Sequence, residues 1–309
     1  MKRALLLING SAGKMNMEKH VYRIIETLAV NGYETTVYPI IPDKGIFSED
    51  ILERAAASSS GPAYDLVVCG GGDGTLNHVI NGLMAMPKEK RPVLGYIPAG
   101  STNDFAKSIH IPEEIGEACE VLTGGMPFPY DIGCFNEKYF NYIAAFGAFS
   151  EISYSTDQNF KNVFGHAAYI LNGLANLQEN IGYKCHMRIE TDGKIREDDY
   201  VFGAVYSATS VGGFPIRYVP DVRLDDGAFE MVLIKAPGNI TDLNKIVQAL
   251  TARDFDSPYL SFTKVKEVKI HAERPVGWTL DGEFGGELSD TVIRVENRAM
   301  TIMVKKPEM

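Results

Sequence analysis

Two short stretches of the sequence combine glycines, small polar residues and an aspartate, "GGGDGTLNHV" at 70–79 and "IPAGSTNDFA" at 97–106. Glycine lets backbone N–H groups approach an anion without an intervening side chain. A helix that begins there adds unpaired N–H groups and the positive end of its dipole. Each stretch follows an apolar run and precedes a helical pattern. The pair therefore predicts a phosphate-binding edge at the carboxyl ends of neighbouring parallel strands.

Asp73 is the unusual residue of the first stretch. A carboxylate inside a phosphate loop repels phosphate unless it contacts a metal ion, a hydroxyl or a nearby donor. The alternative is a glycine-rich turn that packs a strand against a helix, with Asp73 as the helix cap. Neither the P-loop nor the dinucleotide-binding fingerprint fits, because "GGGDGT" lacks their endings and spacings.

Two later segments contain acidic residues as well. In "TLDGEF" at 279–284, a carboxylate could accept a hydroxyl proton during phosphoryl transfer, although Asp-Gly is also a common hairpin turn. In "YVPDVRLDDGAFEM" at 218–231, the residues alone are explained by a β-turn with Asp-Gly at its tip.

The elements that must position these residues fall into two groups. Up to about residue 127, strands alternate with helices, which predicts an α/β domain with a parallel sheet. Beyond it, short strands separated by turn signals predict a largely antiparallel, β-sandwich-like second domain, interrupted by helices near 160–180 and 240–253. We expect domains at 1–127 and 128–309, with the last strand able to pack back on the first. The expected helices of the first domain span 16–31, 48–60, 75–86, 102–109 and 113–123.

Composition narrows the class of protein. The net charge of −10 argues against a nucleic-acid partner. No window reaches the ~18 apolar residues of a transmembrane span, and the first apolar run is too short for a signal peptide. The four cysteines lie far apart, as is typical of reduced thiols in a cytoplasmic protein.

Together, "GGGDGTLNHV", "IPAGSTNDFA" and the late "LDGE" resemble the diacylglycerol kinase catalytic family, soluble lipid kinases that include sphingosine and ceramide kinases. The resemblance implies ATP and Mg²⁺ in a cleft between the two domains. It makes Glu283 the general base with Asp281 beside it, and gives Asp73 and Asp104 catalytic roles. The implied nucleotide site consists of Asn9, Ser11, Gly71, Gly72, Asp73, Gly74, Thr75, Asn77, Ser101 and Asn103.

The same resemblance implies a structural magnesium site in the second domain. Asp226 would give a side-chain oxygen, and the main-chain carbonyls of Arg223 and Ala228 would complete it, with Asp225 acting indirectly. Three features depart from the family pattern. His78 stands where glutamate is usual, Ser101 where threonine is usual, and "NGSAGK" replaces an Asn-Pro start. For His78, a helix-surface residue without a role in the site is the favoured interpretation.

The leading hypothesis is a lipid kinase that converts diacylglycerol to phosphatidic acid at the membrane surface. Such a protein would be cytoplasmic and reach the inner membrane face transiently. The segment "DQNFKNVFGHAAY" at 157–169 is a candidate contact, although an ordinary buried helix face is the favoured interpretation. The alternatives are an NAD kinase-like phosphotransferase with a soluble acceptor, and a catalytically silent nucleotide- or lipid-binding regulator. An exposed edge strand in the second domain could support a homodimer.

Overall fold

The computed structural model describes residues 1–10, 17–57, 64–147, 184–211, 214–215, 222–252, 254 and 256–307. Its first part is a parallel sheet with the order β2-β1-β3-β4. Strands β1, β3 and β4 are apolar and largely buried, as parallel strands covered on both faces must be; residues 4–7, for example, are fully buried. Strand β2, at the edge of the sheet, is mostly exposed or half-buried. The four strands are β1 (Lys2–Asn9), β2 (Tyr33–Ile40), β3 (Leu66–Gly71) and β4 (Val93–Pro98).

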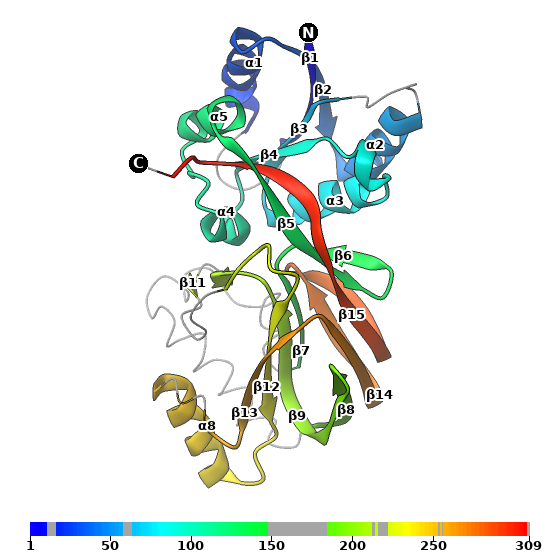
Figure 1. Cartoon of the computed structure of the whole chain (residues 1–309), viewed down its shortest axis with the longest axis vertical. Helices are drawn as coiled ribbons and strands as arrows, with labels where there is room; N and C mark the ends of the chain where they lie inside the picture. The colour runs from blue at the N-terminus through cyan, green and yellow to red at the C-terminus, as the bar shows by residue number, and fades with distance from the viewer. Residues whose placement is uncertain are drawn as a thin grey trace.

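Helices cover both faces of this sheet. One pair, α1 with α5, lies on the opposite side of the strands from the pair α2 with α3 (Figure 1). Apolar residues at helical spacing face the strands; Ile24 and Leu28 of α1 are fully buried. The helices are α1 (Val21–Val30), α2 (Ser48–Ala57), α3 (Asp73–Met84), α4 (Asp104–Ser108) and α5 (Ile115–Gly124), with single 3-10 turns at Met17–His20, Pro42–Lys44 and Lys88–Lys90.

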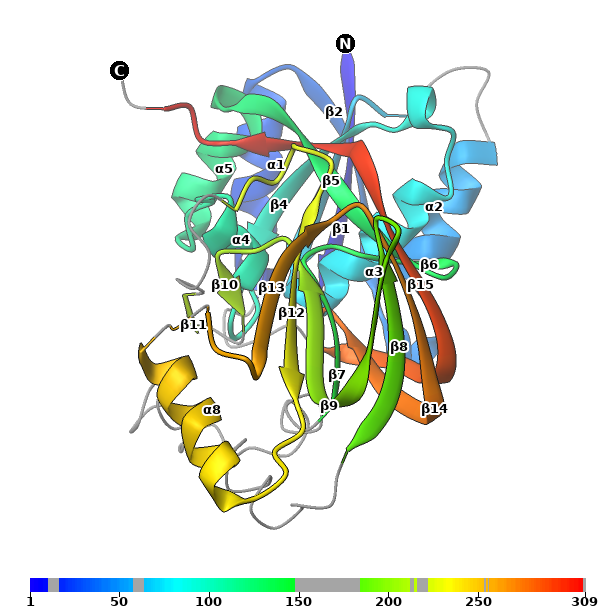
Figure 2. The same cartoon turned by 60° about the horizontal axis from the view of Figure 1, so that its bottom comes forward.

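The second part is a curved antiparallel sheet whose core surrounds Trp278. The ring of Trp278 packs edge-on against Phe135 and Phe146, each at 4.9 Å between ring centroids. Helix α8 (Ile240–Ala252) packs outside this core on β9, β12 and β13 (Figure 2). The strands are β6 (Lys138–Phe140), β7 (Ile143–Gly147), β8 (Cys185–Thr191), β9 (Lys194–Tyr206), β12 (Phe229–Lys235), β13 (Leu260–Val265) and β14 (Glu267–Leu280), with a small ribbon of β10 (Ser210–Val211) and β11 (Phe214–Pro215).

Two long strands join the parts. Strand β15 (Glu283–Val304) pairs with β14 at its beginning and with β4 at its end, where Ile302 lies beside Leu94. Strand β5 (Met126–Phe135) pairs with β15 over most of its length. Figure 1 shows β15, in red, rising from the lower part into the upper part. The β14–β15 hairpin is thereby attached directly to the sheet of the first part.

These elements confirm the expected fold class, an α/β part followed by a largely antiparallel part. Helix α3 begins at Asp73, two residues before the expected start, because the extended backbone of Gly72 lets the helix follow β3 at once. The helix expected near 240–253 is α8. The expected helix at 160–180 and the candidate membrane contact at 157–169 lie outside the described residues.

Candidate active site

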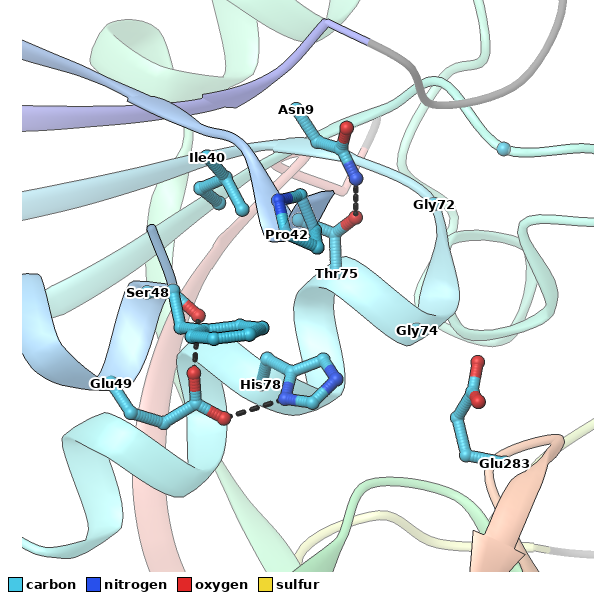
Figure 3. A pocket seen from close by; sticks show the side chains of 12 residues that line it. Asn9, Ile40, Pro42, Ser48, Glu49, Gly72, Gly74, Thr75, His78 and Glu283 are labelled. Atoms are coloured by element: carbon cyan, nitrogen blue, oxygen red, sulfur yellow. Dashed lines mark hydrogen bonds and ion pairs between the residues drawn. The ribbon is translucent and has the colours of Figure 1, made fainter. Parts of the chain in front are cut away.

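A cavity of about 330 Å³ opens at the carboxyl ends of β1, β2 and β3, close to the start of α3 (Figure 3). It lies at the position where parallel sheets bind ligands. Several residues expected at a nucleotide site line it, together with residues from the β2–α2 connection. The lining consists of Asn9, Ile40, Pro42, Phe47, Ser48, Glu49, Gly72, Gly74, Thr75, His78, Gly100 and Glu283.

The two glycine-containing loops touch each other at the wall of the cavity. A Cβ at position 100 would lie 2.7 Å from the Cα of Gly72, and a Cβ at position 72 would lie 3.0 Å from the Cα of Gly100. The 2.7 Å distance is shorter than any real Cβ contact, and at 3.0 Å the backbone of the neighbouring loop would have to shift. The glycines are therefore needed for loop-to-loop packing as well as for the approach of a ligand to the backbone.

Asp73 links the first loop to the second. Its Oδ2 accepts hydrogen bonds from Thr102 Oγ1 at 3.2 Å and from the backbone N–H of Asp104 at 3.1 Å, and its Oδ1 accepts from the N–H of Phe105 at 3.4 Å. A hydroxyl and two helix-start amides thus supply the partners that a carboxylate in this loop requires. Burial, followed by the nearby charge of Asp104, raises the pKa of Asp73 to about 6, although these donors oppose the rise.

Asp104 links the second loop to the part of the chain near residue 210. Its side chain is buried, and Oδ1 accepts a hydrogen bond from Ser210 Oγ at 2.7 Å. One helical turn later, Ser108 Oγ accepts from the N–H of Thr209 at 3.1 Å. Neither Asp73 nor Asp104 is among the cavity-lining residues. Both instead hold together the loops that form its wall.

Glu283 reaches the cavity from a tight hairpin. Leu280 pairs with Glu283 across a two-residue turn, in which Asp281 and Gly282 have φ values of 50° and 91°. Positive φ at both turn residues matches the twist of a hairpin and explains the Asp-Gly sequence. The turn directs the Glu283 carboxylate toward the first turn of α3, where a Cβ on Gly74 would lie 2.9 Å from Oε1 (Figure 3).

Asp281 faces away from the cavity and joins three segments. Its Oδ2 accepts from Asn77 Nδ2 at 2.7 Å and from the N–H of Asn141 at 2.6 Å, while Oδ1 accepts from the N–H groups of Tyr142 and Ile143 at 2.9 and 3.0 Å. Burial raises the pKa of Asp281, and these hydrogen bonds oppose the rise. The side chain fixes the hairpin that carries Glu283 against α3.

Of the other residues expected at the nucleotide site, some line the cavity and others hold the lining segments in place. Asn9 Nδ2 donates to Thr75 Oγ1 at 3.0 Å, so β1 and α3 meet in the cavity. Asn103 closes the second loop by accepting from the N–H of Gly100 at 2.8 Å. Asn103 lies outside the lining, as do Gly71 at the end of β3, Asn77 on Asp281 and the exposed Ser101. Ser11 lies outside the described residues.

His78 is part of the cavity, contrary to the favoured interpretation of a helix-surface residue without a role in the site. Its Nδ1 lies 2.5 Å from Glu49 Oε1, and Ser48 Oγ donates to Glu49 Oε2 at 3.0 Å. The hydrogen bond to Glu49 raises the pKa of His78. Burial opposes ionisation of Glu49, but its bonds to His78 and Ser48 outweigh this and lower its pKa. A carboxylate thus reaches this wall from α2 rather than from position 78.

Sequence analysis missed Phe47, Ser48 and Glu49 as lining residues. The available signal was their place just after β2, at the same sheet edge as the two loops. Sequence patterns indicated only that Ser48 starts a helix with Glu49 in its first turn, which the structure shows for α2.

The residues expected to hold a structural magnesium ion lie elsewhere, in the connection that leads into β12. Asp226 Oδ1 accepts from the N–H of Ala228 at 3.1 Å, and Oδ2 is in contact with the ammonium of Lys264. Within the described ranges, no three His, Cys, Asp or Glu side chains are grouped so as to hold a metal ion. A Mg²⁺ on this carboxylate would lie against the positive ammonium of Lys264, so the Asp226 side chain in this arrangement does not fit a bound ion.

The sequence matches two family models, the diacylglycerol kinase catalytic domain over residues 3–135 and the YegS C-terminal NAD kinase beta sandwich-like domain over residues 145–304. A diacylglycerol kinase of Bacillus subtilis is 32% identical over 99% of this chain and 98% of its own length. The chain belongs to the diacylglycerol kinase family. A second diacylglycerol kinase, from Staphylococcus carnosus, is 32% identical over 93% of this chain and 90% of its own length.

The fold is also that of the diacylglycerol kinase family. A solved diacylglycerol kinase structure from Bacillus anthracis has a TM-score of 0.74 at 22% identity, covering 98% of this chain and 97% of that one. An NAD kinase from Archaeoglobus fulgidus in complex with ATP has a TM-score of 0.53 at 14% identity, covering 98% and 94%. Membership of a kinase family implies use of ATP. No helix in the described part of the chain is long and apolar enough to cross a bilayer.

Proposed function

We propose that the protein is a diacylglycerol kinase, which transfers the γ-phosphoryl group of ATP to the free hydroxyl of diacylglycerol and yields phosphatidic acid and ADP. The observation that carries the proposal is the position of Glu283. Its carboxylate lies at the N-terminal turn of α3, where the two glycine-containing loops meet. A proton acceptor and a phosphate-binding backbone thus face the same cavity, as transfer of phosphate to an alcohol requires.

In this proposal the backbone N–H groups at the start of α3 bind the phosphates, aided by the helix dipole. The acceptor hydroxyl lies between Glu283 and the γ-phosphorus. As the new oxygen–phosphorus bond forms and the bond to ADP breaks, Glu283 takes the hydroxyl proton. Thr75 and Asn9, held together at 3.0 Å, fix the opposite wall. Asp73, Asp104 and Asp281 act as positioning residues through their bonds to the loops and the hairpin.

We assign magnesium only to the nucleotide. Kinase sites bind Mg²⁺ largely through substrate phosphates, with one or two carboxylates added. The cavity fits this requirement, because Glu49 and Glu283 line it together with the hydroxyl of Ser48. When bound, the ion spreads the negative charge that the γ-phosphoryl group carries during transfer. Glu283 serves as the base, and both oxygens of Glu49 already have partners in His78 and Ser48, so we assign the main ligands of the ion to the nucleotide phosphates.

A lipid acceptor requires access to a membrane surface. We propose that the protein is cytoplasmic and binds the inner face of the membrane peripherally during turnover. We also propose a homodimer formed through β13, the edge strand of the sheet in the second part. Sedimentation with vesicles that contain diacylglycerol tests the first proposal. Light scattering of the purified protein tests the second.

The central experiment measures ADP release by purified protein with Mg-ATP, offered micellar diacylglycerol, sphingosine, monoacylglycerol or NAD. We expect turnover with diacylglycerol. Glu283→Gln should reduce kcat by about 10²- to 10⁴-fold, the usual contribution of a general base, with ATP affinity unchanged. Glu287→Gln, an exposed glutamate on the same strand, is the matched control.

Each other outcome has a definite meaning. Turnover with NAD alone would replace the lipid acceptor with a soluble one. ATP binding without ADP release for any acceptor would support a catalytically silent regulator. Full activity of Glu283→Gln with diacylglycerol would support the diacylglycerol kinase function but show that Glu283 is not the general base.

A further inference from the structure

The acidic connection between residues 224 and 228 is fixed by backbone and side-chain contacts. Asp131, which is buried, accepts from the N–H groups of Gly227 at 2.6 Å and Arg298 at 2.7 Å. The N–H of Asp131 in turn donates to the carbonyl of Leu224 at 2.7 Å. The connection is therefore held in one conformation by its neighbour β5. This conformation presents Asp225 and Asp226 to the strands beside them.

Each of these two aspartates contacts a basic side chain of the same chain. Arg298 Nη2 donates to Asp225 Oδ2 at 2.9 Å. Lys264, on β13, contacts Asp226 Oδ2 and lies 3.6 Å from Glu230 Oε1. The second contact follows from strand register, because Glu230 and Lys264 are direct partners across β12 and β13. One ammonium thus lies between two carboxylates.

Glu230 is the buried carboxyl residue of this cluster. The residue is only 2% exposed, and neither of its carboxylate oxygens has a hydrogen-bond partner among the described residues. Lys264 Nζ lies 3.6 Å from this buried carboxylate, and the Lys264 side chain remains 42% exposed.

The resemblance of "YVPDVRLDDGAFEM" to the family's magnesium loop places a divalent ion on Asp226. In the structure, Asp226 Oδ1 is taken by the N–H of Ala228 and Oδ2 by Lys264. An ion could bind this carboxylate only by displacing the lysine. We propose that the ammonium of Lys264 is the resident cation of this loop, in the place of a structural magnesium ion, so that the fold of the second part does not depend on divalent cations.

The test is thermal unfolding without nucleotide or lipid, so it is independent of kinase activity. Tm is measured for each protein in EDTA and in Mg²⁺ or Ca²⁺. The proteins are wild type, Asp226→Asn, Lys264→Met, Lys264→Arg and the double variant Lys264→Met/Asp226→Asn. The quantity scored is the rise in Tm on adding the cation, counted only where Asp226→Asn abolishes that rise. This condition excludes binding of the cation elsewhere on the protein. Lys235→Met is the control, because Lys235 has the same 42% exposure and an ion pair with Asp198 at 2.5 Å.

We expect a score of zero for wild type and Lys264→Arg. Lys264→Met should unfold several degrees lower in EDTA and regain stability as the cation concentration rises, because an ion that binds only the folded state stabilises it. Lys235→Met should show no cation response. A rise in wild-type Tm that Asp226→Asn abolishes would overturn the proposal, and so would a Lys264→Met variant without a cation response. If Lys264→Met does not fold, the comparison of wild type with Asp226→Asn decides alone.

Discussion

The backbone of Gly74 and the carboxylate of Glu283 are separated by less space than one methyl group requires. A Cβ at position 74 would lie 2.9 Å from Glu283 Oε1, although the two residues belong to different halves of the chain. Gly74 lies in the first turn of α3, and its φ is not positive. Glycine at this position therefore leaves room for the Glu283 carboxylate, and the backbone conformation of the helix does not require it.

Gly74→Ala should separate activity from stability. Alanine favours a helix over glycine by up to ~1 kcal/mol, and the atom it meets is the movable end of a side chain, so we expect Tm to stay level or rise. The displaced carboxylate should lower kcat at least tenfold, because misplacement by about 1 Å is costly in catalysis. Urea unfolding and steady-state kinetics on the same preparation check both expectations. A loss of stability with unchanged kcat would contradict this interpretation.

Asp281→Asn should destabilise the whole protein. The amide keeps one acceptor oxygen, so two of the four N–H donors would face an NH₂ group inside the protein. We expect a loss of ~3 kcal/mol or more in the free energy of unfolding. Asparagine tolerates the positive φ of 50° at this position, so backbone strain does not explain the effect.

Urea titration measures the loss in Asp281→Asn, and Asp290→Asn, an exposed aspartate on the following strand β15, is the control. A change below about 1 kcal/mol would mean that Asp281 does not hold the hairpin in place.

Asp73 should give the fold a specific pH dependence. Its folded pKa is raised from 3.8 to about 6, so the protonated form is favoured in the folded state. The resulting stability is fully present below the unfolded pKa and is lost as pH rises toward 6, by up to ~3 kcal/mol. We expect the Tm of wild type relative to Asp73→Asn to fall between pH 4 and 6 and then level off. A constant difference across this range would show that Asp73 titrates normally.

His78→Glu, which introduces the residue usual in the family, should be unfavourable in this chain. The new carboxylate would face Glu49, whose Oε1 lies 2.5 Å from the imidazole it replaces. Repulsion at this half-exposed position should weaken ATP binding by about 1 kcal/mol, or roughly fivefold. Adding Glu49→Gln should restore the affinity, and calorimetry of ATP binding measures both effects. Unchanged affinity in the single variant would remove Glu49 from the nucleotide site.

The parts of the site that could be predicted from sequence are those fixed by local backbone requirements. Glycines after an apolar strand, with a helix following, predicted the loop at 70–74 because such a loop needs close backbone approach. The Asp-Gly pair before Glu283 predicted a hairpin because both turn residues need positive φ. In each case the reason acts within a few residues, so the sequence pattern is sufficient.

Contacts between distant segments could not be predicted in this way. His78 and Glu49 meet because α2 packs on α3, and either residue alone is typical of a helix surface. Asp281 was expected beside the base as a catalytic group, yet its side chain is buried on Asn77 and the backbone of 141–143. The contact of Lys264 with Glu230 depends on the β12–β13 register, which has no signature in either segment.

Strand β15 has a consequence for the order in which the protein can fold during synthesis. Its last residues lie beside β4, so one edge of the parallel sheet formed by the first hundred residues is completed only by Ile302, which is made about 200 residues after β4. Until then the β4 edge has unpaired backbone groups and can associate with other chains. A ribosome-bound chain that stops before residue 299 would expose this edge. Nascent chains of this protein should therefore need protection, for instance by a chaperone, until β15 has left the ribosome.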